Sequence, residues 1–161
     1  MQQKLLFDKV LFNLMPTVKD LMTKNVVTVD ANKTVVEAAV LMSEKDIGDL
    51  VVLDGITPVG IITERDLVRR VLAEGKSADS KVSEIMTHPL RVIDPDSPIK
   101  EAARRMVSKR IRRLPVIKDN KLVGIISAAD FARHLSKKTL TDEILEAIGR
   151  RHYPVPESFE K

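Results

Sequence analysis

Strand-like and helix-like spacings of hydrophobic residues succeed each other along the chain. VVTV (26–29) is short and β-branched, as expected of a strand. Thr34-Val-Val-Glu37 is a capping box, which predicts the start of a helix. The apolar positions that follow in this helix are Val36, Ala39, Val40 and, near its end, Ile47.

A hairpin and a second helix are predicted next. LVVL (50–53) has the composition of a buried strand, Asp54-Gly55 marks a turn, and PVGII (58–62) returns antiparallel. The second helix runs from about Glu64 to Ala73 and ends before Gly75. The order of elements in this segment is therefore β-α-β-β-α.

The same segment occurs a second time. A shift of 64 residues places VKDLMT (18–23) on VSEIMT (82–87) and VGIITERD (59–66) on VGIISAAD (123–130) without a gap. The second copy predicts a strand RVI (91–93), a helix capped by Ser97 with Pro98 as its first residue, strands LPVI and LVGII around an Asp119-Asn120 turn, and a helix from Ala128. We predict an α/β (α+β) fold of two similar units packed about a pseudo-two-fold axis.

The repeat divides the chain into four parts. Residues 18–75 form repeat 1 and residues 82–138 form repeat 2. Residues 1–17 are apolar-dense and predict a flanking helix that covers the core or a dimer interface. Residues 139–161 predict a short amphipathic helix and a tail.

Composition narrows the function classes. The chain has 161 residues, no cysteine and three histidines, no two of them four residues apart, so we expect no disulfide, thiolate chemistry or metal site. No nucleophile has a base at recognisable spacing, so we expect no enzyme. There is no apolar run of about 18 residues and no signal peptide pattern, which predicts a cytoplasmic protein without membrane contact. A net charge of +4 suits a small anionic ligand.

The most informative motif closes each hairpin: Gly60-Ile-Ile-Thr63-x-x-Asp66, repeated as Gly124-Ile-Ile-Ser127-x-x-Asp130. Thr or Ser followed three residues later by Asp is a common helix cap. The same geometry can also bind a ligand, because the hydroxyl can donate to a phosphate and the carboxylate can accept both hydroxyls of a ribose. The residues alone leave both interpretations open.

The span from about Val18 to Leu135 resembles a tandem pair of CBS domains, or Bateman module. The resemblance rests on the β-α-β-β-α order, on Leu114-Pro115-Val116, and on the two motifs that end in Asp66 and Asp130. It implies a regulatory, homodimeric protein that binds an adenine nucleotide (AMP, ADP or ATP) or an S-adenosyl compound in the cleft between the repeats.

The resemblance also assigns two ligand sites. The first would use Ser127, Asp130, Arg112 and Arg113 for phosphate and ribose, with Met22, Val27, Ile47 and Gly48 around the adenine. The second would use Thr63 and Asp66, with Met86, Arg91, Ile111 and Arg112 near the base. Repeat 1 has Gly48-Asp49 where repeat 2 has Arg112-Arg113, and an acid repels phosphate. We therefore expect the Asp130 site to be the stronger one.

Two other functions remain open. The chain could be a structural or interaction scaffold with empty clefts. It could also take part in nucleic-acid regulation through Arg69-Arg70, Arg104-Arg105 and Arg150-Arg151, although its 3 % of aromatic residues offers little for base stacking. Neither the adenosyl ligand nor the regulated partner follows from the sequence.

Overall fold

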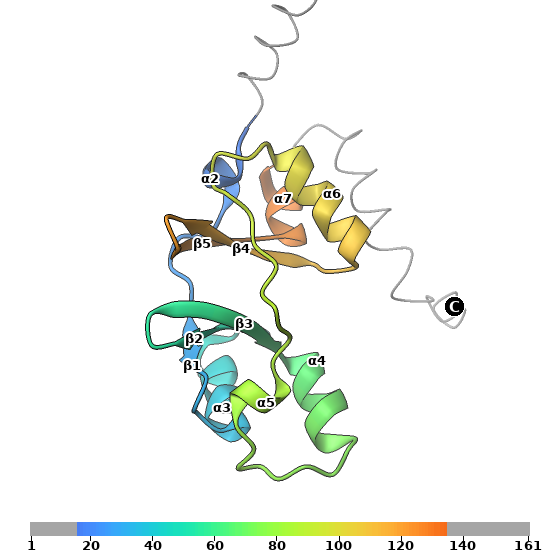
Figure 1. Ribbon diagram of the computed structural model, residues 1–161. Helices are drawn as coiled ribbons and strands as arrows, with labels where there is room; N and C mark the ends of the chain where they lie inside the picture. The colour runs from blue at the N-terminus through green and yellow to red at the C-terminus, as the bar shows by residue number, and fades with distance from the viewer. Residues whose placement is uncertain (1–15, 135–161) are drawn as a thin grey trace, which may run out of the picture. The chain divides into compact units, whose positions relative to one another are not determined.

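The computed structural model describes residues 16–134, which form two compact units (Figure 1). We name each unit after its buried aspartate. The Asp66 unit comprises Lys24–Val92 and Ile117–Gly124, and the Asp130 unit comprises the described residues up to Thr23, Ile93–Val116 and those from Ile125 onward. The predicted mixed α and β fold is confirmed. The predicted helix within 1–17, apart from Pro16 and Thr17, and the C-terminal helix and tail lie outside the described residues.

The Asp66 unit is built on a three-stranded sheet. Its elements are β1 (Thr28–Asp30), α3 (Val35–Lys45), β2 (Asp49–Asp54), β3 (Thr57–Thr63), α4 (Glu64–Asp66), the π-helix η1 (Leu67–Leu72) and α5 (Val82–Ile85). The strand order is β1-β2-β3, with β1 parallel and β3 antiparallel to β2. The predicted hairpin is confirmed, and Gly55 at its turn has a φ of 59° that favours glycine.

Helix α3 begins at the predicted capping box. The backbone N–H of Glu37 donates to the Thr34 hydroxyl at 3.2 Å, and the Thr34 N–H donates to a Glu37 carboxylate oxygen at 2.8 Å. The helix buries Val35, Ala38 and Met42. The apolar face predicted from Val36, Ala39 and Val40 is wrong: all three residues are exposed, Val36 by 46 % and Val40 by 50 %.

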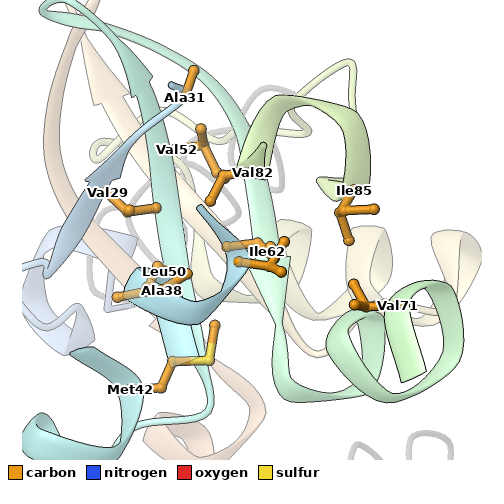
Figure 2. Close-up of a cluster of buried hydrophobic side chains, with 11 residues drawn as sticks. Val29, Ala31, Ala38, Met42, Leu50, Val52, Ile62, Val71, Val82 and Ile85 are labelled. Atoms are coloured by element: carbon orange, nitrogen blue, oxygen red, sulfur yellow. The ribbon is translucent and has the colours of Figure 1, made fainter. Parts of the chain in front are cut away.

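The core of the Asp66 unit lies between the sheet and the helices. Leu50, Val52 and Ile62 from the sheet are fully buried. In Figure 2, Val82 at the start of α5 lies near Ile62 of β3. Ile85 at the end of α5 lies near Val71 of η1. Burying such side chains stabilises a fold by about 1.5–3 kcal/mol each.

The Asp130 unit repeats this plan with fewer regular elements. They are α2 (Val18–Leu21), α6 (Ile99–Lys109), β4 (Arg113–Lys118), β5 (Lys121–Ser127) and α7 (Ala128–His134), except that the tip of the β4–β5 hairpin, Ile117–Gly124, belongs to the Asp66 unit. Both strands show the order of buried and exposed residues found in β2 and β3. Among the fully buried residues of this unit are Val18, Ile93, Ala102, Met106, Leu114, Val116, Ile126 and Phe131.

The strand predicted at 91–93 is wrong. Only Ile93 pairs, in a single parallel bridge with Val116, and the described strands of this hairpin form a two-stranded sheet. In repeat 1 the N–H of Ala31 extends the equivalent ladder by donating to the Leu53 carbonyl at 2.8 Å. The residue equivalent to Ala31 is Pro95, which has no N–H to donate.

The predicted start of the second-repeat helix is also displaced by one residue. Pro98 is the N-cap of α6 rather than its first residue, with an extended ψ of 142° and no side-chain cap. Pro98 is the equivalent of Thr34, so repeat 2 has lost the hydroxyl that caps repeat 1.

The short helices α2 and α5 were not predicted, and each belongs to the unit of the other repeat. Helix α2 begins repeat 1 along the chain, yet Thr23 just after it pairs with Ile125 of β5. Likewise Thr87, just after α5, pairs with Ile61 of β3. The repeats in the sequence and the units in space therefore differ at these two segments, and they differ as well at Ile117–Gly124. None of the helices within residues 16–134 is long and apolar enough to cross a bilayer.

Candidate ligand-binding site

The first candidate site centres on the Asp130 carboxylate, where β5 runs directly into α7. The backbone N–H and the hydroxyl of Ser127 both donate to Oδ2 of Asp130 at 2.7 Å. Asp130 is 3 % exposed, which is unusual for an aspartate. The helix-cap interpretation of the motif is therefore confirmed, and its role in ligand binding stays a prediction.

An arginine balances the charge of this buried carboxylate. Nη2 of Arg133, one turn along α7, donates to Oδ1 of Asp130 at 2.5 Å. The Arg133 side chain is mostly exposed, so it reaches the carboxylate from solvent. A buried carboxylate is costly to remove from water unless it is paired and hydrogen-bonded, and Arg133 and Ser127 supply both.

Other predicted site residues lie near the same end of this unit. The N–H of Ala128 donates to the Arg112 carbonyl at 2.9 Å, which holds the exposed Arg112 at the start of α7. Arg113 is the first residue of β4, and Ile111, two residues earlier, is half-buried. The pairing of Thr23 with Ile125 brings Met22 alongside the end of β5. Within the Asp130 unit, Met22, Arg112, Ser127 and Asp130 are thus brought together.

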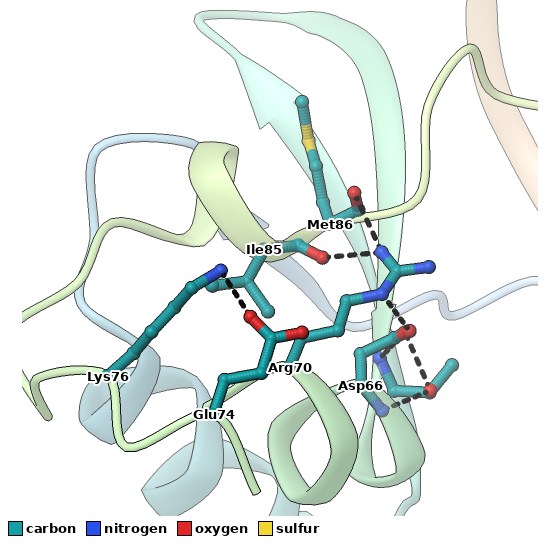
Figure 3. Close-up of polar contacts among 7 residues, drawn as sticks. Asp66, Arg70, Glu74, Lys76, Ile85 and Met86 are labelled. Atoms are coloured by element: carbon teal, nitrogen blue, oxygen red, sulfur yellow. Dashed lines mark hydrogen bonds and ion pairs between the residues drawn. The ribbon is translucent and has the colours of Figure 1, made fainter. Parts of the chain in front are cut away.

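The second candidate site centres on Asp66 and has the same cap. The N–H and the hydroxyl of Thr63 donate to Oδ2 of Asp66 at 3.0 and 2.7 Å. Its arginine partner comes from a different position: Nε of Arg70 lies 3.4 Å from Oδ1. Nη1 of Arg70 also donates to the carbonyl oxygens of Ile85 and Met86 at 2.7 and 3.3 Å (Figure 3). Arg70 therefore ties the buried carboxylate to the end of α5.

An aspartate and two glycines lie close to the motif that ends in Asp66. Asp49 pairs with Thr63 in the β2–β3 ladder, beside the motif. The Gly48 carbonyl accepts the Glu64 N–H at 3.1 Å, and a Cβ at Gly48 would lie 2.9 Å from Oε2 of Glu64. A Cβ at Gly60 would lie 2.4 Å from the sulfur of Met86. Glycine at both positions therefore keeps side chains close to the motif.

The remaining predicted residues are placed as follows. Val27, Ile47 and Gly48, which the prediction groups with Asp130, belong to the Asp66 unit, and Val27 and Ile47 pack against its core. Arg91 is exposed in the segment that follows α5. Ile111, grouped with Asp66, belongs to the Asp130 unit.

Sequence reasoning missed the two arginines that pair with the carboxylates. The signal was present, because Asp66–Arg70 has i,i+4 spacing and Asp130–Arg133 has i,i+3 spacing on a predicted helix. Exposed pairs at this spacing contribute little, and only burial of the aspartates makes these two important. Across the described residues no group of three or more His, Cys, Asp or Glu side chains could hold a metal ion.

Comparison with known proteins decides the family. The model of the CBS domain matches the chain twice, at residues 18–73 and 82–137. The chain belongs to the CBS domain family. The CBS domain-containing protein YhcV of Bacillus subtilis is 38 % identical over 118 residues, which are 73 % of this chain and 84 % of that protein.

Solved CBS structures agree with the fold. The CBS domain pair of protein MJ0100, solved in complex with 5′-methylthioadenosine and S-adenosyl-L-methionine, has a TM-score of 0.69 at 31 % identity over 75 % of this chain and 96 % of that one. A hexameric CBS-CP12 protein from bloom-forming cyanobacteria has a TM-score of 0.70 at 35 % identity over 83 % and 78 %.

Proposed function

We propose that this CBS-domain protein is a cytoplasmic regulatory module without catalytic activity, which binds AMP, ADP, ATP or an S-adenosyl compound and signals its ligand state to a partner protein. The observation that carries the proposal is the Asp130 carboxylate, buried in the first turn of α7 and hydrogen-bonded to Ser127, with Arg112 held at the same helix start. The adenosyl ligands of the MJ0100 pair support the ligand class.

Each residue of the Asp130 site has a chemical role in this proposal. Asp130 accepts the ribose hydroxyls, and Ser127 donates its hydroxyl to the ligand. Arg112 and Arg113 bind phosphate, for which the planar guanidinium is well suited. Met22, Val27, Ile47 and Gly48 surround the adenine. For a ribose to reach Oδ1 of Asp130, the Arg133 guanidinium has to move aside, which its exposure allows.

The Asp66 site is the weaker one in this proposal. Thr63 and Asp66 would bind phosphate and ribose there, with Met86, Arg91 and Ile111 near the base. However, Asp49 stands beside Thr63 and repels phosphate, where repeat 2 has Arg113. Arg70 is also held by two backbone carbonyls, so displacing it from Asp66 costs hydrogen bonds that Arg133 does not make in the described contacts.

Regulation in this proposal follows from differential binding. A ligand shifts the arrangement of the protein only as far as it binds one arrangement more tightly than another. The protein acts as a homodimer, as the hexameric CBS-CP12 relative suggests for self-association in the family. The identity of the regulated partner does not follow from the chain.

Calorimetric titration of the protein with AMP, ADP, ATP and S-adenosylmethionine tests the proposal. One adenosyl ligand should bind, and Asp130→Ala should abolish most of that binding. Asp130→Asn keeps an oxygen that can accept hydrogen bonds from Ser127. Its melting temperature without ligand shows whether the helix cap survives when the carboxylate charge is removed. Asp66→Asn is the matched control at the other repeat and should leave most binding intact.

Two results would overturn this assignment. If Asp66→Ala abolishes binding while Asp130→Ala does not, the strong site is the other one. If no adenosyl ligand binds or raises the melting temperature, the scaffold function is favoured. A ligand at 100 times its dissociation constant should stabilise the fold by about 2.7 kcal/mol, which thermal unfolding readily detects.

A further inference from the structure

In the described contacts, the Asp66 carboxylate lacks free acceptor positions for both hydroxyls of a ribose. An ionised carboxylate offers about four such positions. The N–H and the hydroxyl of Thr63 take two of them on Oδ2, at 3.0 and 2.7 Å. Nε of Arg70 lies 3.4 Å from Oδ1 and covers a third. A ribose that donates both hydroxyls to Asp66 therefore has to displace Arg70.

Backbone carbonyls hold Arg70 in this place. Its Nη1 donates to the carbonyl oxygens of Ile85 and Met86 at 2.7 and 3.3 Å, at the end of α5 (Figure 3). The guanidinium is charged, and charge-assisted hydrogen bonds are roughly twice as strong as neutral ones. The Arg70 side chain is 42 % exposed, whereas Arg133, which pairs with Asp130, is 65 % exposed and makes no such bond in the described contacts. A ligand therefore displaces Arg133 more easily than Arg70.

The π-helix η1 places Arg70, rather than its neighbour in the sequence, beside the carboxylate. The Ala73 N–H donates to the Val68 carbonyl, five residues earlier, at 2.9 Å. A turn closed by such a bond holds more residues than an α-helical turn, so the fourth residue after the aspartate lies above it instead of the third. The 64-residue shift aligns Arg133 with Arg69, which is exposed. The two repeats therefore pair their aspartates with arginines at positions that are not equivalent.

We propose that Arg70 closes the Asp66 site to a ribose, so that each chain binds its adenosyl ligand at Asp130 alone. This role rests on the proposed function and names the residue that makes the two sites unequal. Because Arg70 belongs to the same unit as Asp66, it competes with a dissolved ligand at a high effective concentration. A ribose gains its hydrogen bonds to Asp66 only after the ion pair and the carbonyl bonds of Arg70 are broken.

The charge of Asp49 is a different barrier, which an uncharged ligand does not meet. Asp49 pairs with Thr63 in the β2–β3 ladder and repels phosphate. Adenosine has the base and the ribose of the proposed ligands but no phosphate. Binding of adenosine therefore reports on Arg70 without the contribution of Asp49.

Equilibrium dialysis against adenosine tests this role, with the number of molecules bound per chain as the measurement. Arg70→Ala should bind one adenosine more than the wild type, because acceptor positions of Asp66 become free. The affinity of the Asp66 site should rise at least about tenfold, since charged hydrogen bonds that oppose the ligand are removed. Adding Asp66→Asn should abolish the gained binding, because an amide cannot accept at both of its ends. 2′,3′-Dideoxyadenosine, which lacks both ribose hydroxyls, should not fill the gained site.

Two further variants separate the position of the arginine from its charge and its packing. Arg69→Ala removes the same charge from the neighbouring, exposed position of η1, so the number of bound adenosines should stay that of the wild type. Arg70→Met keeps an unbranched apolar chain in place of the arginine stem but has no donor, so it should gain a site as Arg70→Ala does. Circular dichroism shows which variants keep the fold at the temperature of the dialysis.

Three results would overturn the role of Arg70. The first is a folded Arg70→Ala or Arg70→Met protein that binds no more adenosine than the wild type. The second is an Arg69→Ala protein that gains as much binding as Arg70→Ala, which would make net charge the cause. The third is a wild type that binds adenosine at both sites and loses one molecule in Asp66→Asn. The proposed function survives all three, since each still allows an adenosyl ligand at Asp130. If the wild type and every variant bind neither adenosine nor AMP, ADP, ATP or S-adenosylmethionine, the proposed function fails, and the role of Arg70 with it.

Discussion

The two repeats of this protein have nearly the same interior and different surfaces. Strands β2 and β4 share one order of buried and exposed residues, and β3 and β5 share another. The positions that differ most are exposed: Val36 and Val40 on α3 correspond to Lys100 and Arg104 on α6. The comparison shows that packing constrains the core of both copies, whereas the surface is left to carry different interactions.

The arginines beside the two buried aspartates show the same division. Both carboxylates accept the N–H and the hydroxyl of the residue that ends the strand. Arg70 then joins Asp66 to two carbonyls of the α5 region, whereas Arg133 reaches Asp130 from solvent. The partner of Asp66 is therefore held in place by backbone carbonyls of its unit. The partner of Asp130 is an exposed side chain that a ligand could displace.

The largest effect is expected from the residue that makes the two cores unequal. Phe131 is fully buried, and its equivalent Leu67 is half-buried. Phe131→Ala should lower the free energy of unfolding by about 3–5 kcal/mol, because it removes a whole ring from a packed core. Urea unfolding followed by circular dichroism measures this. Leu67→Ala is the matched variant, and a loss as large as that of Phe131→Ala would refute the inequality.

Removal of Arg70 should lower the stability of the protein more than removal of Arg133. Arg70→Ala should destabilise the protein by about 1.5–3 kcal/mol, because it breaks hydrogen bonds between a charged group and two carbonyls and leaves Asp66 without that partner. Arg133→Ala should cost less than Arg70→Ala, because the exposed guanidinium makes no hydrogen bond to a backbone carbonyl in the described contacts and Asp130 keeps both donors of Ser127. Thermal unfolding of both variants at one pH gives the comparison, and equal losses would contradict it.

The helix caps offer a smaller difference. Thr34→Ala should cost about 1 kcal/mol, because the N–H of Glu37 loses its acceptor. Thr34→Ser keeps the hydroxyl and should cost much less. Pro98→Ala at the equivalent position removes no side-chain cap, so urea unfolding should show a smaller loss than for Thr34→Ala. A loss at Pro98 equal to that at Thr34 would show that the cap is not the source of the effect.

The smallest effect concerns acid stability. The hydrogen bond from Lys33, followed by that from the Thr34 N–H, lowers the pKa of Glu37 from 4.5 to about 2. Because the pKa is depressed in the folded state, the ionised Glu37 stabilises the fold above pH 4.5, and this contribution is lost as the pH falls from there toward 2. The urea midpoint of Glu37→Gln should therefore fall less over this range than that of the wild type.

The equivalent acid of repeat 2, Glu101, provides a second test of this pH dependence. Hydrogen bonds from Arg105 and then Arg104 also lower the pKa of Glu101. As the pH is lowered, the urea midpoint of Glu101→Gln should therefore also fall less than that of the wild type. If neither substitution changes how the urea midpoint falls with pH, other carboxylates govern the acid stability.

The repeat, the order β-α-β-β-α of its first copy and the caps at Thr34, Thr63 and Ser127 could be predicted from the sequence alone. These follow from local rules: the Thr34 capping box, the Asp54-Gly55 turn and the two motifs at Thr63 and Ser127 all formed as predicted, since each depends on residues within a few positions of one another. The family could also be predicted from the sequence, because the same ordered pattern occurs twice.

Tertiary structure decided the rest. The missing strand at 91–93 depended on a ladder that Pro95 cannot extend, and the burial of Val35 rather than Val36 depended on which helix face meets the sheet. The partners of Asp66 and Asp130, and the placement of α2 and α5 in the opposite units, join residues far apart along the chain or depend on burial. Local patterns do not encode such contacts, because their energies arise only when desolvation and packing bring the groups together.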